Sequence, residues 1–324
     1  MHVESIDASL SIQDGGIDLE SKTKLALVIA GNFSGDEENA DPCSLLNYLP
    51  EDIAGQCQLI EWSCQPSNHY SMKLTTEMEN MFETLVSDGY TGIIVISGSG
   101  VMEEMAYLTD LLWQHPQPVI FANLMVQGRA GLAEGLMNLR CSVQAALSEE
   151  AKDKGVLVCS SGELFAASEV VMVDPTSPEN IFQSPEKGSL GKMLNDEVKF
   201  FRSVRRPCFL ARQPETPAAV ELVYASLGGG ERIISSLTSN KEIQGLVLAG
   251  FGTGNVPPAW VPHIRNILRK RIPVAVVSRC FQGHVAKANY FEGCYVKLLE
   301  MGVMSGGKLN HYQARKKIAL GIAS

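Results

Sequence analysis

The stretch GIIVISGSGVMEEMAYLTDLLWQ (92–114) decides the fold class of this 324-residue chain. Residues 92–98 form a nearly continuous apolar run that ends in glycine, which is typical of a strand buried on both faces of a parallel sheet. Residues 102–114 carry apolar side chains at helical spacing, and a short glycine-containing turn separates the two segments. A buried strand, a tight turn and a helix make up half of a βαβ unit.

The same alternation recurs along the chain. Further helical patterns cover residues 75–89 and 260–271. Apolar runs of the same kind occupy residues 25–31, 118–123, 155–160, 245–250 and 273–278. Strands that alternate with helices predict an α/β protein built on a doubly wound, mostly parallel sheet.

One stretch, PTSPENIFQSPEKGSLGK (175–192), is rich in Pro, Gly and Ser and breaks this alternation before a second βα series begins. We therefore expect a larger N-terminal α/β domain over residues 24–200 and a smaller C-terminal α/β domain over residues 201–324. Residues 1–23 are polar and acidic, and they show no apolar periodicity, so we expect a flexible leader.

The composition argues against nucleic-acid and membrane partners. Lys and Arg number 27 against 36 Asp and Glu, which gives a formal net charge of −9 and no basic field for nucleic acid. The pairs Arg205-Arg206 and Lys316-Lys317 are expected to be solvated positions. No apolar run approaches the roughly 18 residues that span a bilayer, and the N-terminus lacks the pattern of a secretory signal.

Cysteine and histidine usage indicates the compartment. The eight cysteines are scattered without a C-x-x-C pair, which favours free thiols in a reducing, cytoplasmic setting. The six histidines are dispersed, and no Cys/His cluster is present in the sequence, so we expect no metal and no cofactor.

Three glycine-rich stretches fail as cofactor or nucleophile motifs. GFGTGN (250–255) does not have the spacing G-x-G-x-x-G, and GSLGKM (188–193) is not a P-loop. SGSG (97–100) lacks the first glycine of a nucleophile elbow. Location is more informative: in such folds ligands bind beyond the carboxyl ends of the strands, so the loops after Gly31, Gly98, Asn123 and Gly250 should line a site.

Several segments, in the right order, resemble the bacterial-type L-asparaginase/glutaminase family. The segment at residues 278–290 is more similar to the cytoplasmic type of the family than to the secreted type. The quoted stretch resembles the family's H-G-T-D-T-M-E-E-T-A, and the closing GVMSGGKLNHYQARKKIALGIA resembles its G-x-x-S-G-x-D-x-T-x-x-x-A ending. The other matching segments are residues 134–146, 155–192, 245–257 and 278–290. The likeness covers about residues 24–324 and implies an asparaginase-like two-domain fold that assembles as a homo-dimer or homo-tetramer.

The catalytic residues implied by this resemblance are missing. The nucleophilic Thr of T-G-G-T-I falls at Asn32, which has no hydroxyl. The second Thr and the Asp of H-G-T-D-T fall at Val101 and Gly100, and the Lys of the third stretch falls at Met172. Gly100 thereby removes the carboxylate that, by resemblance, holds the substrate's α-ammonium. Catalytic groups act as a unit, so such losses cost orders of magnitude in rate.

Both members of the charged Lys–Asp pair that the resemblance implies are replaced in this chain. Breaking a buried Lys–Asp pair by losing one partner would cost about 3–5 kcal/mol, but here both charges are gone. Apolar Met172 and Val101 stand in their neighbourhood, which predicts a pocket repacked as apolar with these two residues close together.

Other hydroxyls remain as candidate nucleophiles. Ser34 follows Asn32 by two residues, and Ser99 stands at the family's earlier Thr. Either one is a relocated nucleophile or an ordinary loop residue. No His or Lys that could act as a base lies nearby in sequence, which argues for the ordinary loop residue. Asp174 either points into the site or caps the next turn, and capping is favoured.

The candidate ligand-binding positions are also carried over by resemblance. Ser67 matches the serine that binds the substrate carboxylate, or it is a plain loop serine, and Ser97 stands at the motif's His. Glu134 matches a family Asp of structural character. Asn255 and Tyr290 match positions where a neighbouring subunit approaches the active site, or they simply support turns. The set is Asn32, Ser67, Ser97, Ser99, Gly100, Asn255 and Tyr290.

Three hypotheses follow. The favoured one is an asparaginase-fold pseudoenzyme, or an enzyme with repurposed chemistry, that binds a small, amino-acid-like ligand in the old cleft. The second is an active L-asparaginase that uses Ser34 or Ser99 as nucleophile, and the lost α-ammonium anchor argues against it. The third is a non-catalytic subunit of an oligomeric complex. This hypothesis is favoured if Val101, Met172 and Phe33 fill the cleft.

Overall fold

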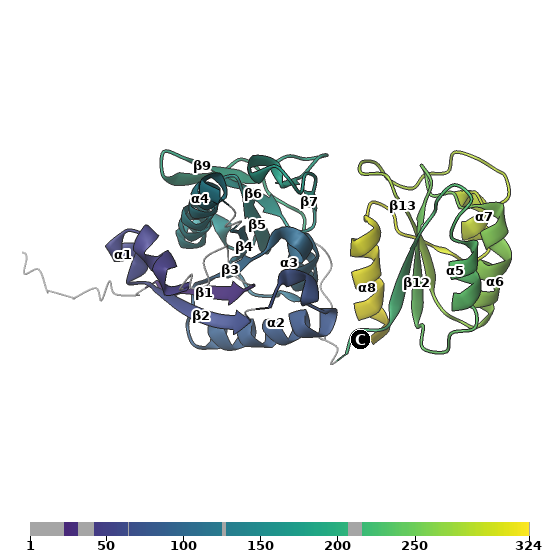
Figure 1. The fold of residues 1–324 in the computed structure, drawn as a ribbon, viewed down its shortest axis with the longest axis horizontal. Coiled ribbons are helices and arrows are strands. Elements are labelled where there is room, and N and C mark those ends of the chain that lie inside the picture. Colours follow the sequence, from purple (N-terminus) through teal and green to yellow (C-terminus); the bar gives the residue numbers. More distant parts are fainter. Residues whose placement is uncertain (1–22, 32–41, 64, 125–127, 207–215, 324) are drawn as a thin grey trace, which may run out of the picture.

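The computed structural model describes residues 23–31, 42–63, 65–124, 128–206 and 216–323. The leader expected at residues 1–23 lies, apart from Thr23, outside the described residues. The described chain forms two α/β bodies side by side, each with its own sheet (Figure 1).

The N-terminal sheet has eight strands in the order β10-β9-β6-β5-β4-β3-β1-β2. The first five strands in the sequence pair in parallel, and the last three add an antiparallel edge, which confirms the predicted mostly parallel sheet. The strands are β1 (Leu25–Ala30), β2 (Cys57–Ser63), β3 (Gly92–Ser97), β4 (Val119–Asn123), β5 (Val156–Ser160), β6 (Glu163–Ala166), β9 (Gly191–Leu194) and β10 (Glu197–Phe200).

Helices cover both faces of this sheet because its central strands are apolar on both sides. Every residue of β1, β3, β4 and β5 is buried. Helices α2 (Met72–Ser87) and α3 (Met102–Leu112) pack on one face through Phe82 and Met105. Helix α4 (Gly128–Leu147) packs on the other face through Leu139 and Val143. This is the doubly wound arrangement that the alternation predicts.

Short elements fill the connections. Strands β7 and β8 pair as a small antiparallel ribbon, and β8 lies within the stretch that breaks the alternation. The remaining elements of this half are η1 (Pro42–Tyr48), α1 (Glu51–Ala54), η2 (Ser67–His69), η3 (Ser99–Val101), η4 (Glu149–Ala151), β7 (Val171–Met172), η5 (Pro178–Asn180) and β8 (Phe182–Gln183).

The C-terminal sheet has four parallel strands in the order β11-β12-β13-β14. Helices α5, α6 and α7 pack on one face, and α8 covers the face turned toward the N-terminal body (Figure 1). The elements are β11 (Val220–Tyr224), α5 (Glu231–Leu237), β12 (Gly245–Gly250), η6 (Pro258–Trp260), α6 (Val261–Arg269), β13 (Val274–Ser278), α7 (Tyr295–Glu300), β14 (Met304–Ser305) and α8 (His311–Ala323).

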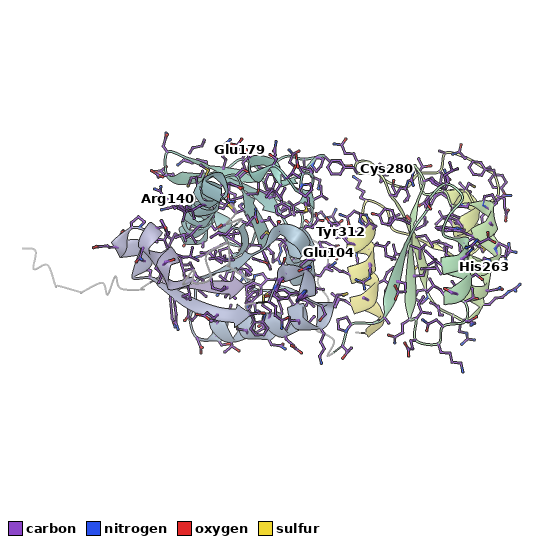
Figure 2. All side chains as sticks on the ribbon, viewed as in Figure 1. Glu104, Arg140, Glu179, His263, Cys280 and Tyr312 are labelled. Atoms are coloured by element: carbon purple, nitrogen blue, oxygen red, sulfur yellow. The ribbon has the colours of Figure 1, made fainter. Side chains whose placement is uncertain are left out.

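Side chains of helix α8 connect the C-terminal body to the N-terminal body. The Tyr312 hydroxyl lies 3.0 Å from Glu103 Oε2 and 3.1 Å from the Val170 carbonyl oxygen. Lys316 forms an ion pair with Glu104 on α3. Figure 2 shows Glu104 and Tyr312 together at this junction. The first sheet ends at Phe200 and the second begins at Val220, while the boundary at residues 200/201 stays a prediction.

Two further findings concern the composition. The five cysteines that the structure describes, Cys57, Cys141, Cys159, Cys280 and Cys294, are all free thiols. Within the described ranges, none of the helices combines the length and the apolarity that a bilayer-spanning segment needs.

Candidate functional site

Four parallel strands of the N-terminal sheet end along one edge. The last residues of β1, β3 and β4 are Ala30, Ser97 and Asn123, and they are paired across the sheet in register. The last residue pair between β4 and β5 is Ala122 with Cys159, and β5 ends one residue later, at Ser160. The loops after these strands therefore open at the same edge, where ligands bind in such sheets.

The segments after β1, β3 and β2 meet at this edge. A Cβ added to Gly98 would lie 3.0 Å from Ser67 Oγ, and one added to Gly100 would lie 3.6 Å from the same atom. A Cβ added to Gly31 would lie 3.3 Å from the backbone nitrogen of Gly98. The glycines thus let the Ser67 hydroxyl approach the backbone of the β3 loop. The structure therefore brings the predicted Ser67 close to Gly100. The half-buried Ser99 directly precedes Gly100 in the chain.

Val101 and Met172 are predicted to lie close together in an apolar pocket. Both pack, partly buried, against the same apolar cluster of the N-terminal body. The backbone N–H of Met172 donates to Glu103 Oε2, two residues after Val101. Both residues therefore pack against one cluster, while their proximity to each other stays a prediction. Asn32 and Ser34 lie outside the described residues.

The carboxyl of Glu103 was missed by the sequence reasoning. Burial raises the pKa of Glu103, while the hydrogen bonds from Met172 and Tyr312 oppose that rise. Its neighbour Glu104 pairs with Lys316, whose side chain is only 3% exposed and whose pKa is lowered by burial. The motif M-E-E was the signal, but only the tertiary structure shows what faces each carboxylate.

The ion pair lines a cavity of about 480 Å³ between the two bodies. Val101, which belongs to η3 together with Ser99 and Gly100, is one of the residues that line this cavity. Its walls include Tyr70, Lys73, Val101, Glu104, Arg315 and Lys316.

The expectation that both basic pairs are solvated was wrong for one member of each. Lys316 is buried against Glu104, and Arg206 forms an ion pair with the buried Asp110 at 3.6 Å. Lys317 and Arg205 are exposed. Helical periodicity buries one residue of an adjacent pair and exposes the next in α8.

A second polar group lies at the ends of β4 and β5. The Asn138 side-chain nitrogen donates to the Asn123 carbonyl oxygen at 2.9 Å and to Glu134 Oε1 at 3.2 Å. Ser161 Oγ lies 3.4 Å from the same Glu134 oxygen. Burial raises the pKa of Glu134, and these hydrogen bonds oppose the rise. Glu134 thus links α4 to the strand ends, in keeping with the structural character expected of it.

The remaining predicted residues take up supporting contacts. Asn255 Oδ1 accepts a hydrogen bond from the Tyr295 N–H at 3.1 Å, where α7 begins. Tyr290 is 69% exposed on the C-terminal body, and its hydroxyl lies 3.4 Å from Glu300 Oε2. Asp174 accepts from the Thr176 N–H at 2.8 Å, so it caps the turn as expected.

The fold and this edge define a two-domain α/β protein with a candidate ligand site at the carboxyl ends of its strands. Comparison with known proteins gives the family. Residues 29–206 match the family model "Asparaginase, N-terminal", and residues 219–324 match "Glutaminase/Asparaginase C-terminal domain". The chain therefore belongs to the asparaginase/glutaminase family.

Individual relatives agree with this assignment. The chain is 28% identical over 314 residues to the L-asparaginase of Bacillus licheniformis, covering 97% of this chain and 94% of that protein. It is 25% identical over 289 residues to L-asparaginase 2 of Bacillus subtilis, covering 86% and 74%. In fold it is similar to the crystal structure of a protein described as the probable cytoplasmic L-asparaginase of Campylobacter jejuni, with a TM-score of 0.82, 24% identity, and coverage of 93% and 95%.

Proposed function

We propose that this chain is an asparaginase-family protein that does not hydrolyse asparagine by the family's conventional route. Its cleft at the ends of β1 and β3 holds a small, amino-acid-like ligand, either as a pseudoenzyme or with repurposed chemistry. The observation that carries the proposal is Gly100: it stands where the resemblance puts a carboxylate, with Ser67 Oγ 3.6 Å from the place of its missing Cβ.

The apolar pair supports the same conclusion. Met172 stands at the position that the resemblance gives to a lysine, and it packs with Val101 against one apolar cluster. Hydroxyl nucleophiles need an adjacent base to become reactive at neutral pH. Neither Gly100 nor Met172 can act as that base.

A second candidate is an amidohydrolase with a relocated nucleophile. Ser99 favours it, because its hydroxyl-bearing side chain stands in η3, directly before Gly100 and close to Ser67. Ser34 remains the other candidate nucleophile of this reading. A third reading is a non-catalytic subunit that acts through its assembly with another protein.

We also propose a cytoplasmic homo-dimer or homo-tetramer, by the resemblance to the family. Three aromatic side chains in the segment between β13 and α7 are exposed, which supports an assembly, since large apolar side chains left at the surface are candidates for burial in an interface. They are Phe281 (58% exposed), Tyr290 (69%) and Phe291 (48%). Size-exclusion chromatography with light scattering tests this expectation, and a monomer at micromolar concentration overturns it.

The test of the main proposal is ammonia release from L-asparagine and L-glutamine by the purified chain. We expect release no faster than in protein-free buffer. Ser34→Ala and Ser99→Ala variants are assayed in parallel. Turnover that either substitution abolishes would overturn the proposal and establish a hydrolase with a relocated nucleophile.

A further inference from the structure

The cavity between the two bodies carries more positive than negative charge. Its walls hold three cationic side chains, those of Lys73, Arg315 and Lys316, and one carboxylate, that of Glu104. This balance is the opposite of that of the whole chain, whose formal net charge is −9. Figure 2 shows Glu104 at the junction of the two bodies. A hollow that is lined by cations attracts anions, because low-dielectric walls focus the field of those charges.

Arg315 is a cation without a counter-charge in the part of the chain that the structure describes. Its half-buried side chain donates from Nε to the Val220 carbonyl oxygen at 2.8 Å, and its Nη1 lies 3.8 Å from Met72 Sδ. None of the ion pairs among the described residues includes Arg315. A guanidinium has five N–H donors, so further donors of Arg315 stay available to an anion.

The other two cations lie close to Arg315 along the chain or in space. Lys73 directly follows Met72 in the first turn of α2, beside the Arg315 contact. The ammonium of Lys73 has only a loose partner, Glu77 at 3.9 Å, in a largely exposed pair of the kind that contributes little. Burial is the main cause that lowers the pKa of Lys316, and the charge of Arg315 lowers it further, while Glu104 opposes both. The cavity therefore gathers cations from both bodies.

The remaining walls of the cavity are largely apolar, and its size suits a small molecule. Its volume of about 480 Å³ falls within the roughly 300–1,000 Å³ of small-molecule sites. The apolar lining residues include Met72, Val101, Met105, Leu108 and Pro217. A ligand for this cavity therefore combines an anionic group with an apolar organic part.

Phosphate fits the cationic wall better than a carboxylate does. A phosphate monoester carries about 1.5 to 2 negative charges on one group at neutral pH, with three strong acceptor oxygens. A carboxylate carries a single charge. The planar guanidinium of arginine matches phosphate oxygens with two parallel hydrogen bonds, and lysine adds a point charge.

We propose that the junction cavity binds a small phosphate monoester with an apolar organic part, held by Arg315 from the C-terminal body and Lys73 from the N-terminal body. Lys316 stays paired with Glu104. This inference goes beyond the proposed function, and it holds whether or not the chain hydrolyses asparagine. The bound phosphate joins α8 to α2 and supplies the anion that Arg315 lacks among the described residues.

The test is isothermal titration of the full chain with three probes at one ionic strength. Phenyl phosphate carries both parts of the expected ligand, inorganic phosphate lacks the apolar part, and succinate replaces the phosphate by two carboxylates. We expect phenyl phosphate to bind saturably at one site. Inorganic phosphate should bind at least about fivefold more weakly and succinate at least about tenfold more weakly.

Variants assign this binding to the cavity. Arg315→Gln should weaken phenyl phosphate binding at least about tenfold, and Lys73→Gln about threefold, because the lysine side chain is 64% exposed. The matched controls remove the same charges elsewhere: Arg269→Gln at the exposed end of α6 and Lys152→Gln beside Glu149. Both controls should bind within about twofold of the parent chain.

Each contrary result overturns the proposal. Such results are no saturable binding of phenyl phosphate up to about 10 mM, succinate or inorganic phosphate binding as tightly as phenyl phosphate, or equal losses in Arg315→Gln and Arg269→Gln. Should Arg315→Gln fail to fold, Lys73→Gln against Lys152→Gln decides the question, since both side chains are largely exposed. Ammonia release is measured separately, so failure of this site and failure of the proposed function are distinguished.

Discussion

Lys316 and Glu104 form an ion pair that joins α8 of the C-terminal body to α3 of the N-terminal body, next to the loop of the candidate site. The two partners are unequally shielded: the lysine side chain is 3% exposed and the glutamate side chain is 37% exposed. The contact between the two bodies therefore combines a buried cation, Lys316, with a partly hydrated anion, Glu104.

This asymmetry predicts unequal costs for breaking the pair. Glu104→Gln leaves the buried ammonium of Lys316 without its counter-charge, so we expect a loss of about 3 kcal/mol in unfolding free energy. Lys316→Met leaves a carboxylate that can turn to water, so we expect a loss of about 1 kcal/mol. Urea denaturation of the two variants measures both values. Equal losses, or a larger loss for Lys316→Met, would contradict the unequal shielding.

Gly155 makes room for a second ion pair. Its φ is +76°, and an added Cβ would lie 2.5 Å from both Arg206 Nε and Asp110 Oδ1. Gly155→Ala should therefore cost more than about 2 kcal/mol, because strained backbone and a displaced ion pair add together. Gly89→Ala is the matched control: its φ is +84°, but an added Cβ would meet no described atom within 4 Å. The control should lose only about 1 kcal/mol by thermal or chemical denaturation, and similar losses in the two variants would refute the steric argument.

The carboxyl of Asp110 predicts a pH dependence of stability. Burial raises its pKa to about 6, against the hydrogen bond from Val156 and the charge of Arg206. The folded chain thus binds this proton more tightly than the unfolded chain, so its contribution to stability falls as pH rises from about 4 to about 6. The full cost, of the order of 3 kcal/mol, is present at neutral pH.

Asp110→Asn removes this titration. Its unfolding free energy should therefore change less than that of the parent chain between pH 4 and pH 6. Urea denaturation at both pH values gives the comparison. Parallel pH profiles for parent and variant would show that Asp110 titrates alike in the folded and unfolded states.

Gly98 limits the width of the candidate cleft. An added Cβ would lie 3.0 Å from Ser67 Oγ, so Gly98→Ala should displace this hydroxyl and weaken L-asparagine binding by about 1 kcal/mol, or about fivefold. Gly100→Ala should have little effect on binding, because its Cβ would lie at an ordinary 3.6 Å from the same atom. Titration calorimetry measures both affinities, and a stronger effect of Gly100→Ala would place the ligand elsewhere.

The strands were predictable because they are continuous apolar runs. The run at 92–98 becomes β3 (Gly92–Ser97), and the run at 245–250 becomes β12 with the same bounds. Helix α2 begins at Met72, three residues before the predicted start, because Ser71 accepts a hydrogen bond from the Leu74 N–H and caps it. The edge strand β2 was missed because it is only half-buried and carries no continuous apolar run.

The candidate site was predictable only in part. The loop at Gly98–Gly100 could be placed because ligands bind after parallel strands and because the segment resembles a family motif. The approach of Ser67 to those glycines depends on how η2 packs, which no local pattern records. The pairing of Lys316 with Glu104 joins residues 212 positions apart, so sequence spacing carries no sign of it.

By itself, the sequence determined the alternation of strands and helices and the two-domain α/β class, and it predicts the loss of charged groups at Gly100 and Met172. Hydrophobic periodicity and residue identity are local properties, so they can be read along the chain. The tertiary structure alone decided which polar atoms are left unpaired at Asn123, Ser160 and Glu134, and which cation is buried at the domain junction. Burial and pairing depend on neighbours that are distant in sequence, because desolvation is set by everything packed around a group.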